Sequence, residues 1–162
     1  MSDFEVMGAK AEGISPSQLL SRLRSVRSGQ VLALSAACVC GREHLEVAAE
    51  HALRAFQRGT NSANNVMMET LLFASGERQI ARAQEKMSLK EGDDAVALVL
   101  FGASPAEVLQ VSGLEQDDSV LECDELKLRR FGITAMEAGS VPEGLARDLV
   151  LERVAFVEIL KR

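Results

Sequence analysis

A polar turn at residues 75–79, called the corner below, lies between two helical patterns within Leu71–Gln84 of this 162-residue chain. The apolar run ends at Ala74-Ser75-Gly76, and Glu77, Arg78 and Gln79 follow at once. Glycine tolerates the left-handed backbone angles that a sharp reversal needs, and serine can cap either flank. A helix that begins at such a corner presents unpaired amide groups, and an arginine beside them favours an anion such as phosphate. A plain helical hairpin is the alternative interpretation.

Two cysteines and two histidines suggest a second kind of chemistry, a metal site. These residues are Cys38, Cys40, His44 and His51. The histidines are seven residues apart and would share one face of a helix. The spacing matches none of the usual zinc patterns, so core cysteines and ordinary helix histidines are the favoured interpretation, and we expect no metal. With Cys123 the count is odd, which argues for reduced thiols rather than a secreted disulfide scaffold.

Catalysis would need a nucleophile with a base, a metal cluster or a phosphate-binding loop, and the sequence suggests none of them convincingly. The paired carboxylates Asp93-Asp94 and Asp117-Asp118 both lie beside turn signals. Neither pair has a basic or apolar neighbour that would shift a carboxyl pKa usefully. We therefore expect a protein that is not an enzyme and needs no cofactor.

The composition indicates one small domain with an uneven charge distribution. Hydrophobic residues make up 47% of the chain, and the net charge is −6. Residues 1–90 hold 11 Lys and Arg against 9 Asp and Glu, whereas residues 91–162 hold 7 against 15. The first half is thus the plausible face for a polyanion. The apolar runs are too short for a membrane span and the first residues are acidic, so we expect a cytoplasmic protein.

Apolar strand patterns alternate with helical ones along the chain. Strands are predicted over residues 3–7, 30–40 and 95–101. Helices are predicted over 16–26, 42–58, 66–75, 77–88, 105–111, 124–131 and 145–153, and residues 154–160 fit a final strand equally well. Ser15-Pro16 and Ser104-Pro105 are typical helix starts. The predicted fold is one α/β domain over residues 1–162, a small mixed β-sheet covered by several α-helices.

The corner and the polar turn before it resemble a known family. Five segments carry the resemblance: 63–69 (ANNVMME), 71–80 (LLFASGERQI), 95–101 (AVALVLF), 117–122 (DDSVLE) and 152–158 (ERVAFVE). They are similar to the small kinase-associated, tRNA-binding subunit of the KEOPS (EKC) complex, the TPRKB-like or CGI family. This subunit is the archaeal relative of the binding protein of the atypical p53-related kinase. The similarity spans about residues 60–160 in order.

The resemblance implies a non-catalytic subunit of the machine that makes threonylcarbamoyladenosine in tRNA next to the anticodon. Its implied partners are the kinase-like ATPase of the complex and tRNA, held notably by the single-stranded 3′ end. The residues expected to bind RNA are Asn64, Ser75, Gly76, Arg78, Gln79 and Arg82. Phe156 and Ile159 are candidates for docking on the kinase-like subunit, with filling of the core as the alternative for both side chains.

Two rival functions remain. The chain could be a purely protein-binding regulator of the kinase-like subunit, in which Arg78 pairs with Glu69 or Glu77 inside the fold. It could also be a small-molecule-binding enzyme or sensor, which would need a deep polar pocket. Binding of tRNA with and without its 3′ end separates the adaptor from the first rival.

Overall fold

An antiparallel β-sheet forms where the apolar strand patterns lie. The computed structural model describes residues 3–142 and 144–160. Within them the strands are β1 (Phe4–Lys10), β2 (Gln30–Ser35), β3 (Ala95–Phe101) and β4 (Glu115–Gln116), in the order β2-β3-β1-β4. β3 pairs antiparallel with β1 and with β2, and β4 pairs antiparallel with the end of β1. A parallel bridge joins Gln30 to Gly102.

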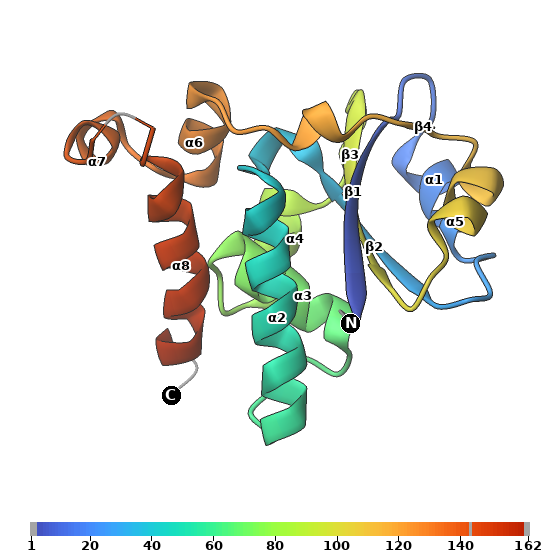
Figure 1. The fold of residues 1–162 in the computed structure, drawn as a ribbon, viewed down its shortest axis with the longest axis horizontal. Coiled ribbons are helices and arrows are strands. Elements are labelled where there is room, and N and C mark those ends of the chain that lie inside the picture. Colours follow the sequence, from blue (N-terminus) through green and yellow to red (C-terminus); the bar gives the residue numbers. More distant parts are fainter. Residues whose placement is uncertain (1–2, 143, 161–162) are drawn as a thin grey trace. The chain divides into compact units, whose positions relative to one another are not determined.

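The chain divides into two compact units. The sheet unit consists of Met1–Ala37 and Ser88–Leu121, and the helical unit consists of Cys38–Met87 and Glu122–Arg162. In the sheet unit, α1 (Pro16–Leu23) and α5 (Pro105–Ser112) contact each other beside the sheet (Figure 1). Their buried side chains share one apolar cluster with alternate residues of β3: Leu19, Leu23, Val96, Leu98, Leu100 and Val108.

Both Ser-Pro signals mark helix starts as predicted. Ser15 accepts a hydrogen bond from the Gln18 amide, while the Gln18 side chain accepts one from the Ser15 amide. Ser104 accepts from the Glu107 amide in the same way. Since each cap satisfies a donor that the first helical turn leaves unpaired, each fixes where the helix begins.

Gly8 lies in the middle of β1, where the sequence suggested an end to the strand. A Cβ at this position would lie 2.6 Å from Val120 Cγ2 and 2.8 Å from the Asp117 carbonyl oxygen. The Gly8 amide donates to Asp118 Oδ1 at 2.9 Å, and the Gly8 carbonyl accepts from the Asp117 amide. Glycine therefore lets the 3-10 turn η2 (Asp118–Leu121) pack directly on the strand, and Asp117-Asp118 serves as its anchor.

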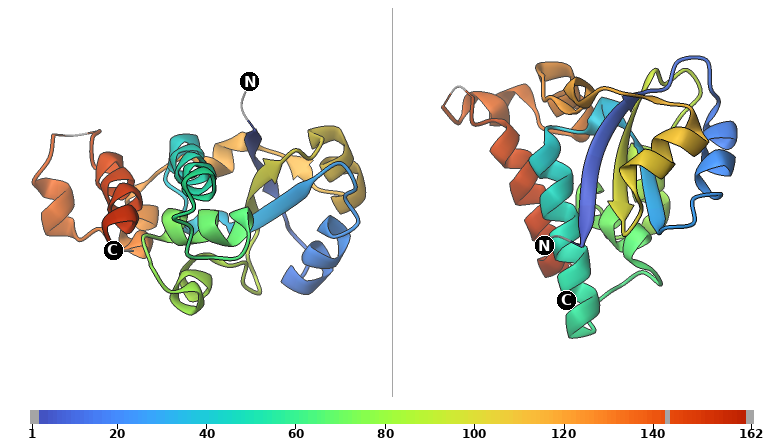
Figure 2. Two further views of the ribbon diagram at one scale, coloured as in Figure 1. Left: turned by 90° about the horizontal axis from the view of Figure 1, so that it is seen from below. Right: turned by 45° about the vertical axis from the view of Figure 1, so that its right-hand side comes forward.

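Three long helices form the centre of the helical unit. They are α2 (Arg42–Arg58), α3 (Val66–Ser75) and α8 (Arg147–Leu160), and each contacts the other two. Figures 1 and 2 show α8 beside α2 in every view. α2 has the predicted bounds and buries its predicted alanine face: Leu45, Ala48, Ala49 and Ala52. α4 (Ile80–Met87), α6 (Glu125–Phe131) and α7 (Ala135–Gly139) complete the unit.

Several predicted boundaries are wrong, and one alternative that the sequence left open is decided. β2 ends at Ser35, because the Ser35 hydroxyl accepts from the Ala37 amide and the chain turns into a 3-10 segment over Ala36–Cys38. α4 begins at Ile80 rather than Glu77, and Ile80, expected in the core, is 38% exposed. Residues 154–160 continue α8 and are not a strand, because Val150, Val154 and Val157 recur at helical spacing and are all buried.

The predicted α/β fold class is confirmed by this combination of one small sheet and several helices. That residues 1–162 form a single domain stays a prediction. In the part of the chain that the structure describes, every helix is too short or too polar to cross a bilayer.

Candidate functional site

The polar corner is a tight reversal between α3 and α4 in the helical unit. α3 ends at Ser75, and Gly76 takes a left-handed conformation with φ +73°. The Gly76 amide donates to the Phe73 carbonyl at 3.2 Å, which closes the last turn of the helix. Residues 77–79 then lead into α4. The left-handed glycine at this C-terminus is as the sequence predicts.

Ser75 closes the corner from inside. Its side chain is fully buried, its hydroxyl donates to the Leu72 carbonyl at 3.0 Å, and the same oxygen accepts from the Glu77 amide at 3.1 Å. Both capacities of the hydroxyl are therefore used within the fold. Ser75 contributes to the shape of the corner, and its hydroxyl does not face solvent.

His44 and Lys86 hold the carbonyl end of α3. His44 Nδ1 accepts from the Cys40 amide at 3.0 Å, so Nε2 carries the proton and donates to the Ala74 carbonyl at 2.7 Å. Burial lowers the pKa of His44 to about 4. Lys86 Nζ donates to the Ser75 carbonyl at 2.7 Å and lies 3.8 Å from the centre of the Phe131 ring. A cation near helix carbonyls is favourable.

Arg78, Gln79 and Arg82 form the exposed face of the corner. Arg82 lies in the first turn of α4, Arg78 lies two residues before the helix begins, and both residues are exposed. Among residues 3–142 and 144–160, the structure shows no ion pair between Arg78 and Glu69 or Glu77. The first amides of α4 lie between the two arginines and have no partner within the helix. This combination suits an anion with several oxygen atoms.

Asn64 lies away from this exposed face. It is in the turn before α3, next to Asn65, whose side chain caps the helix by accepting from the Met68 amide at 2.9 Å. The buried carboxylate of Glu69 fixes the same turn by accepting from the Ser62 and Ala63 amides. α3 has ten residues, and at 1.5 Å per residue it separates Asn64 from the corner by about 15 Å. The structure therefore does not bring Asn64 together with Arg78.

Phe156 and Ile159 lie on the outer side of α8. Their side chains are 50% and 59% exposed, whereas Val150, Val154 and Val157 are fully buried. Core filling is therefore not the role of either side chain in this structure. Two large apolar side chains three residues apart form an exposed stripe along the last two turns of the helix.

The histidines and cysteines that suggested a metal have other contacts. His44 is used at the end of α3, and the His51 ring stacks on Phe73 with 5.1 Å between ring centres. Cys38 donates to the Lys86 carbonyl at 3.5 Å. Within the described ranges, no three His, Cys, Asp or Glu side chains converge in a way that could hold a metal ion.

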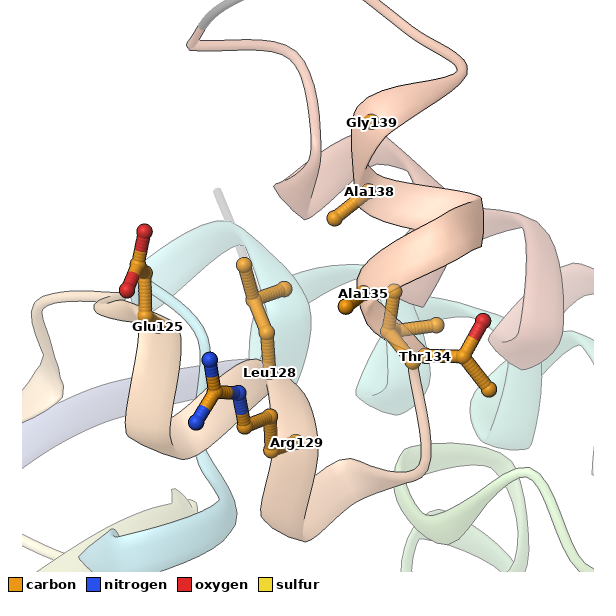
Figure 3. Close-up of a pocket in the computed structure, with 8 residues that line it drawn as sticks. Glu125, Leu128, Arg129, Thr134, Ala135, Ala138 and Gly139 are labelled. Carbon is orange, nitrogen blue, oxygen red and sulfur yellow. The ribbon is translucent and has the colours of Figure 1, made fainter.

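A shallow hollow of about 290 Å³ lies between α6 and α7. Leu128 of α6 and Ala138 of α7 face it from opposite sides, with Glu125 and Arg129 on the α6 side (Figure 3). The hydroxyl of Thr134, also at its edge, accepts from the Glu137 amide as the cap of α7. The hollow contains none of the residues that the sequence singled out, and its lining offers no nucleophile next to a base.

Sequence reasoning missed the supporting residues of the corner. The roles of His44 and Lys86 depend on which elements meet, and no local pattern encodes this. Arg153 of α8 is a further case, since its Cβ and carbonyl lie 3.5 Å and 3.7 Å from where a Cβ on Gly76 would be. Its guanidinium pairs with Glu137 of α7. The helical period of the sequence predicts which face of α8 is buried. It does not predict that this helix packs against the corner.

Comparisons with known proteins agree with the resemblance of the sequence. The family model described as "Kinase binding protein CGI-121" matches residues 14–138. A search of curated proteins gives no match. The match includes the corner and the strand 95–101, and it ends before α8.

Proposed function

The chain belongs to the Kinase binding protein CGI-121 family, and on that premise we propose that it is a non-catalytic subunit of the KEOPS complex. In this role it binds the kinase-like ATPase subunit in the cytoplasm and helps to hold tRNA by its 3′ end. The reaction that it assists is threonylcarbamoyladenosine formation, and the chain supplies binding surfaces rather than reacting groups.

The exposed stripe of α8 supports a protein partner. Interface energy concentrates in a few large apolar side chains that enter pockets on the partner. Phe156 and Ile159 meet this description, because each exposes at least half of its surface on a helix whose other face is packed. We assign the docking surface for the kinase-like subunit to this stripe.

One observation supports RNA binding most directly. At the corner, two arginines occur together with the first amides of α4: Arg78 and Arg82. The arginine side chains are exposed, and the backbone beneath them is held by His44 and Lys86. Because the backbone at the start of the corner is already fixed, binding a phosphate there has to order the arginine side chains but not the chain itself. We assign phosphate contacts to Arg78, Arg82 and these amides, and a polar contact to Gln79. Ser75 and Gly76 give the corner its shape.

Asn64 belongs to a separate contact in this proposal. The bases of a single-stranded RNA end are unstacked and can be splayed out, so such a strand can reach from the corner along α3 to the turn that contains Asn64. The net charge of −6 nevertheless keeps the isolated chain a weak RNA binder. Affinity would then rise when the kinase-like subunit contributes further contacts to the same tRNA.

A purely protein-binding regulator is the second candidate. It would share the α8 surface but would leave the corner without a ligand. The absence of an ion pair of Arg78 with Glu69 or Glu77 among the described residues favours the RNA adaptor, because the rival function gives this arginine a structural partner.

Titration of labelled tRNA distinguishes the two candidates. Intact tRNA and tRNA that lacks its single-stranded 3′ end are titrated with the chain alone and with the chain bound to the kinase-like subunit. The adaptor binds intact tRNA more tightly in both states. Equal affinity for the two RNAs, together with normal co-purification of the kinase-like subunit, would leave only the protein-binding regulator. The purified chain alone should show no turnover of ATP.

A further inference from the structure

Two cysteines that are far apart in the sequence meet in one apolar cluster of the helical unit. Cys40 lies just before α2, and Cys123 lies in the loop before α6. Both are free thiols. Cys40 is buried with Leu128, Phe131, Ile133 and Val150, and Cys123 packs against this group. The third cysteine, Cys38, directs its thiol to the Lys86 carbonyl and so has a different neighbour.

The two thiols differ in their access to solvent. Cys40 is only 3% exposed, whereas Cys123 is partly exposed at the edge of the cluster. A reagent from solution therefore reaches the Cys123 sulfur first. Cys40 can react only with a group that is already inside the cluster, such as the sulfur of Cys123.

Hydrogen bonds fix the backbone on both sides of the pair. The Cys40 amide donates to the fully buried His44 ring at 3.0 Å. Cys123 precedes Asp124, whose carboxylate caps α6 by accepting from the Lys127 amide at 2.8 Å. Neither cysteine therefore needs a large rearrangement of the chain to keep its place beside the other.

Charges around the pair favour a thiolate on the exposed member. The pKa of Cys123 is lowered, first by the hydrogen bond with the Cys40 thiol and then by the cations Lys127 and Arg147, while burial and the Asp124 carboxylate act in the opposite direction. The pKa of Cys40 is raised by the same hydrogen bond and by burial. Cys123 is thus the better nucleophile, and Cys40 keeps its proton.

We propose that Cys123 and Cys40 form an oxidisable dithiol site that reacts with a hydroperoxide and closes to an intrachain disulfide. The Cys123 thiolate attacks one peroxide oxygen, the O–O bond breaks, and the products are a sulfenic acid on Cys123 and hydroxide or alkoxide. The Cys40 sulfur then attacks the Cys123 sulfur. The S–O bond breaks, hydroxide leaves and takes the Cys40 proton as water, and the S–S bond forms. The two thiols lose two electrons and the peroxide gains them.

Closure joins the segment before α2 to the segment before α6. The helices that follow these segments contain His44, in the first turn of α2, and Lys127, in the first turn of α6. A bridge here restrains α6 against the start of α2 within the helical unit. A dithiol reductant reverses it.

The experiment exposes the folded full chain to hydrogen peroxide, then alkylates remaining thiols under denaturing conditions and maps peptides by mass spectrometry. We expect a linked peptide that contains Cys40 and Cys123, with Cys38 still alkylated. Cys38→Ser should give the same link, since this thiol has another neighbour. Before oxidation, brief alkylation should label Cys123 on the order of tenfold faster than Cys38.

Two further variants test the order of events. Cys40→Ser should leave a sulfenic acid on Cys123 that dimedone traps, and Cys123→Ser should leave Cys40 unreacted, with circular dichroism checking that each variant is folded. A dimedone adduct on Cys123 in a folded Cys40→Ser chain supports the mechanism even if the other variant does not fold. The proposal is overturned if wild type gives no Cys40–Cys123 link, if Cys38 and Cys40 link instead, or if Cys40 oxidises first.

Discussion

Lys86 Nζ donates a 2.7 Å hydrogen bond to the carbonyl oxygen of Ser75, and this contact ties the start of the corner to the end of α4. The same ammonium group lies over the Phe131 ring of α6 at 3.8 Å. Burial lowers the pKa of Lys86, while the Glu77 carboxylate acts in the opposite direction. One side chain thereby connects α3, α4 and α6 behind the surface that we assign to RNA.

Replacing this lysine tests its structural role. Lys86→Met keeps most of the apolar stem but removes the donor and the charge. We expect the free energy of unfolding to fall by about 1–3 kcal/mol, as measured by urea denaturation. Lys90→Met is the control, because this side chain is exposed, and it should change the value by less than about 0.5 kcal/mol. Equal effects of the two substitutions would show that the contact to Ser75 contributes nothing.

The buried His44 predicts a pH dependence of stability. An unfolded histidine binds a proton below about pH 6.5, whereas folded His44 does so only below about pH 4. Between these values the unfolded state binds more protons, so the stabilising contribution is complete above about pH 6.5 and is lost as the pH falls. The slope approaches about 1.4 kcal/mol per pH unit.

Urea denaturation at several pH values from 7 to 4 measures this slope. His44→Gln is the matched variant, because its amide can accept from Cys40 and donate to Ala74 without titrating. It should be less stable than wild type at pH 7 but should depend less on pH. If the free energy of unfolding changes with pH equally in both proteins, groups other than His44 cause the pH dependence.

Substitution by alanine can be compared at Gly76 and at Gly139, which have different backbone conformations. Gly76 has φ +73°, so Gly76→Ala should cost about 1–2 kcal/mol of stability, although the space around a Cβ is adequate. Gly139 ends α7 without a left-handed angle, and nothing lies near its Cβ position. Gly139→Ala should be neutral or stabilise by up to about 1 kcal/mol. Thermal unfolding of both variants measures the two effects. If Gly76→Ala is as stable as wild type, the backbone of the corner can change its conformation without cost.

The proposed RNA contact can be tested by replacing Arg78. Arg78→Glu replaces an attraction by a repulsion and should weaken tRNA binding in the assembled complex by about 1–3 kcal/mol, with little change in folding. Arg54→Glu is the charge-matched control. Arg54 is exposed and lies ten residues along α2 from His44, which is about 15 Å along the helix.

Salt provides a second measurement of the same contact. Because few phosphates are engaged, tRNA affinity should fall only gradually with rising salt, and Arg78→Glu should make that dependence weaker still by about one phosphate contact. If Arg78→Glu leaves the affinity unchanged but lowers helical content and the melting temperature, Arg78 is structural. The assignment of this corner to RNA would then be wrong.

Ile159 carries the prediction for the kinase-like partner. Ile159→Glu places a charge on the α8 stripe and should abolish co-purification of that subunit while the chain stays folded. Leu20→Glu, at an exposed apolar position of α1, is the control and should leave co-purification intact. Loss of binding with both variants would indicate a general defect, and loss with neither would move the docking surface away from Ile159.

The local features of this protein can be predicted from its sequence alone. Ser15-Pro16 and Ser104-Pro105 start helices, Gly76 ends one, and 42–58 and 95–101 are the predicted helix and strand. Each of these depends on side chains within one turn or one strand, so neighbouring residues suffice to specify it. The family, too, could be identified from short segments, and the family match agrees.

The residues that support the corner, and those that face outward, follow instead from how the helices pack. Residues 154–160 fit strand or helix until their packing selected the helix, which left Phe156 and Ile159 exposed. Ser75 looked available to a ligand, but its neighbours use both capacities of its hydroxyl. The meeting of Cys40 with Cys123 could not be read from spacing at all. Such contacts join segments far apart in the chain, and their partners are set by how the helices pack, a property that no local window of sequence contains.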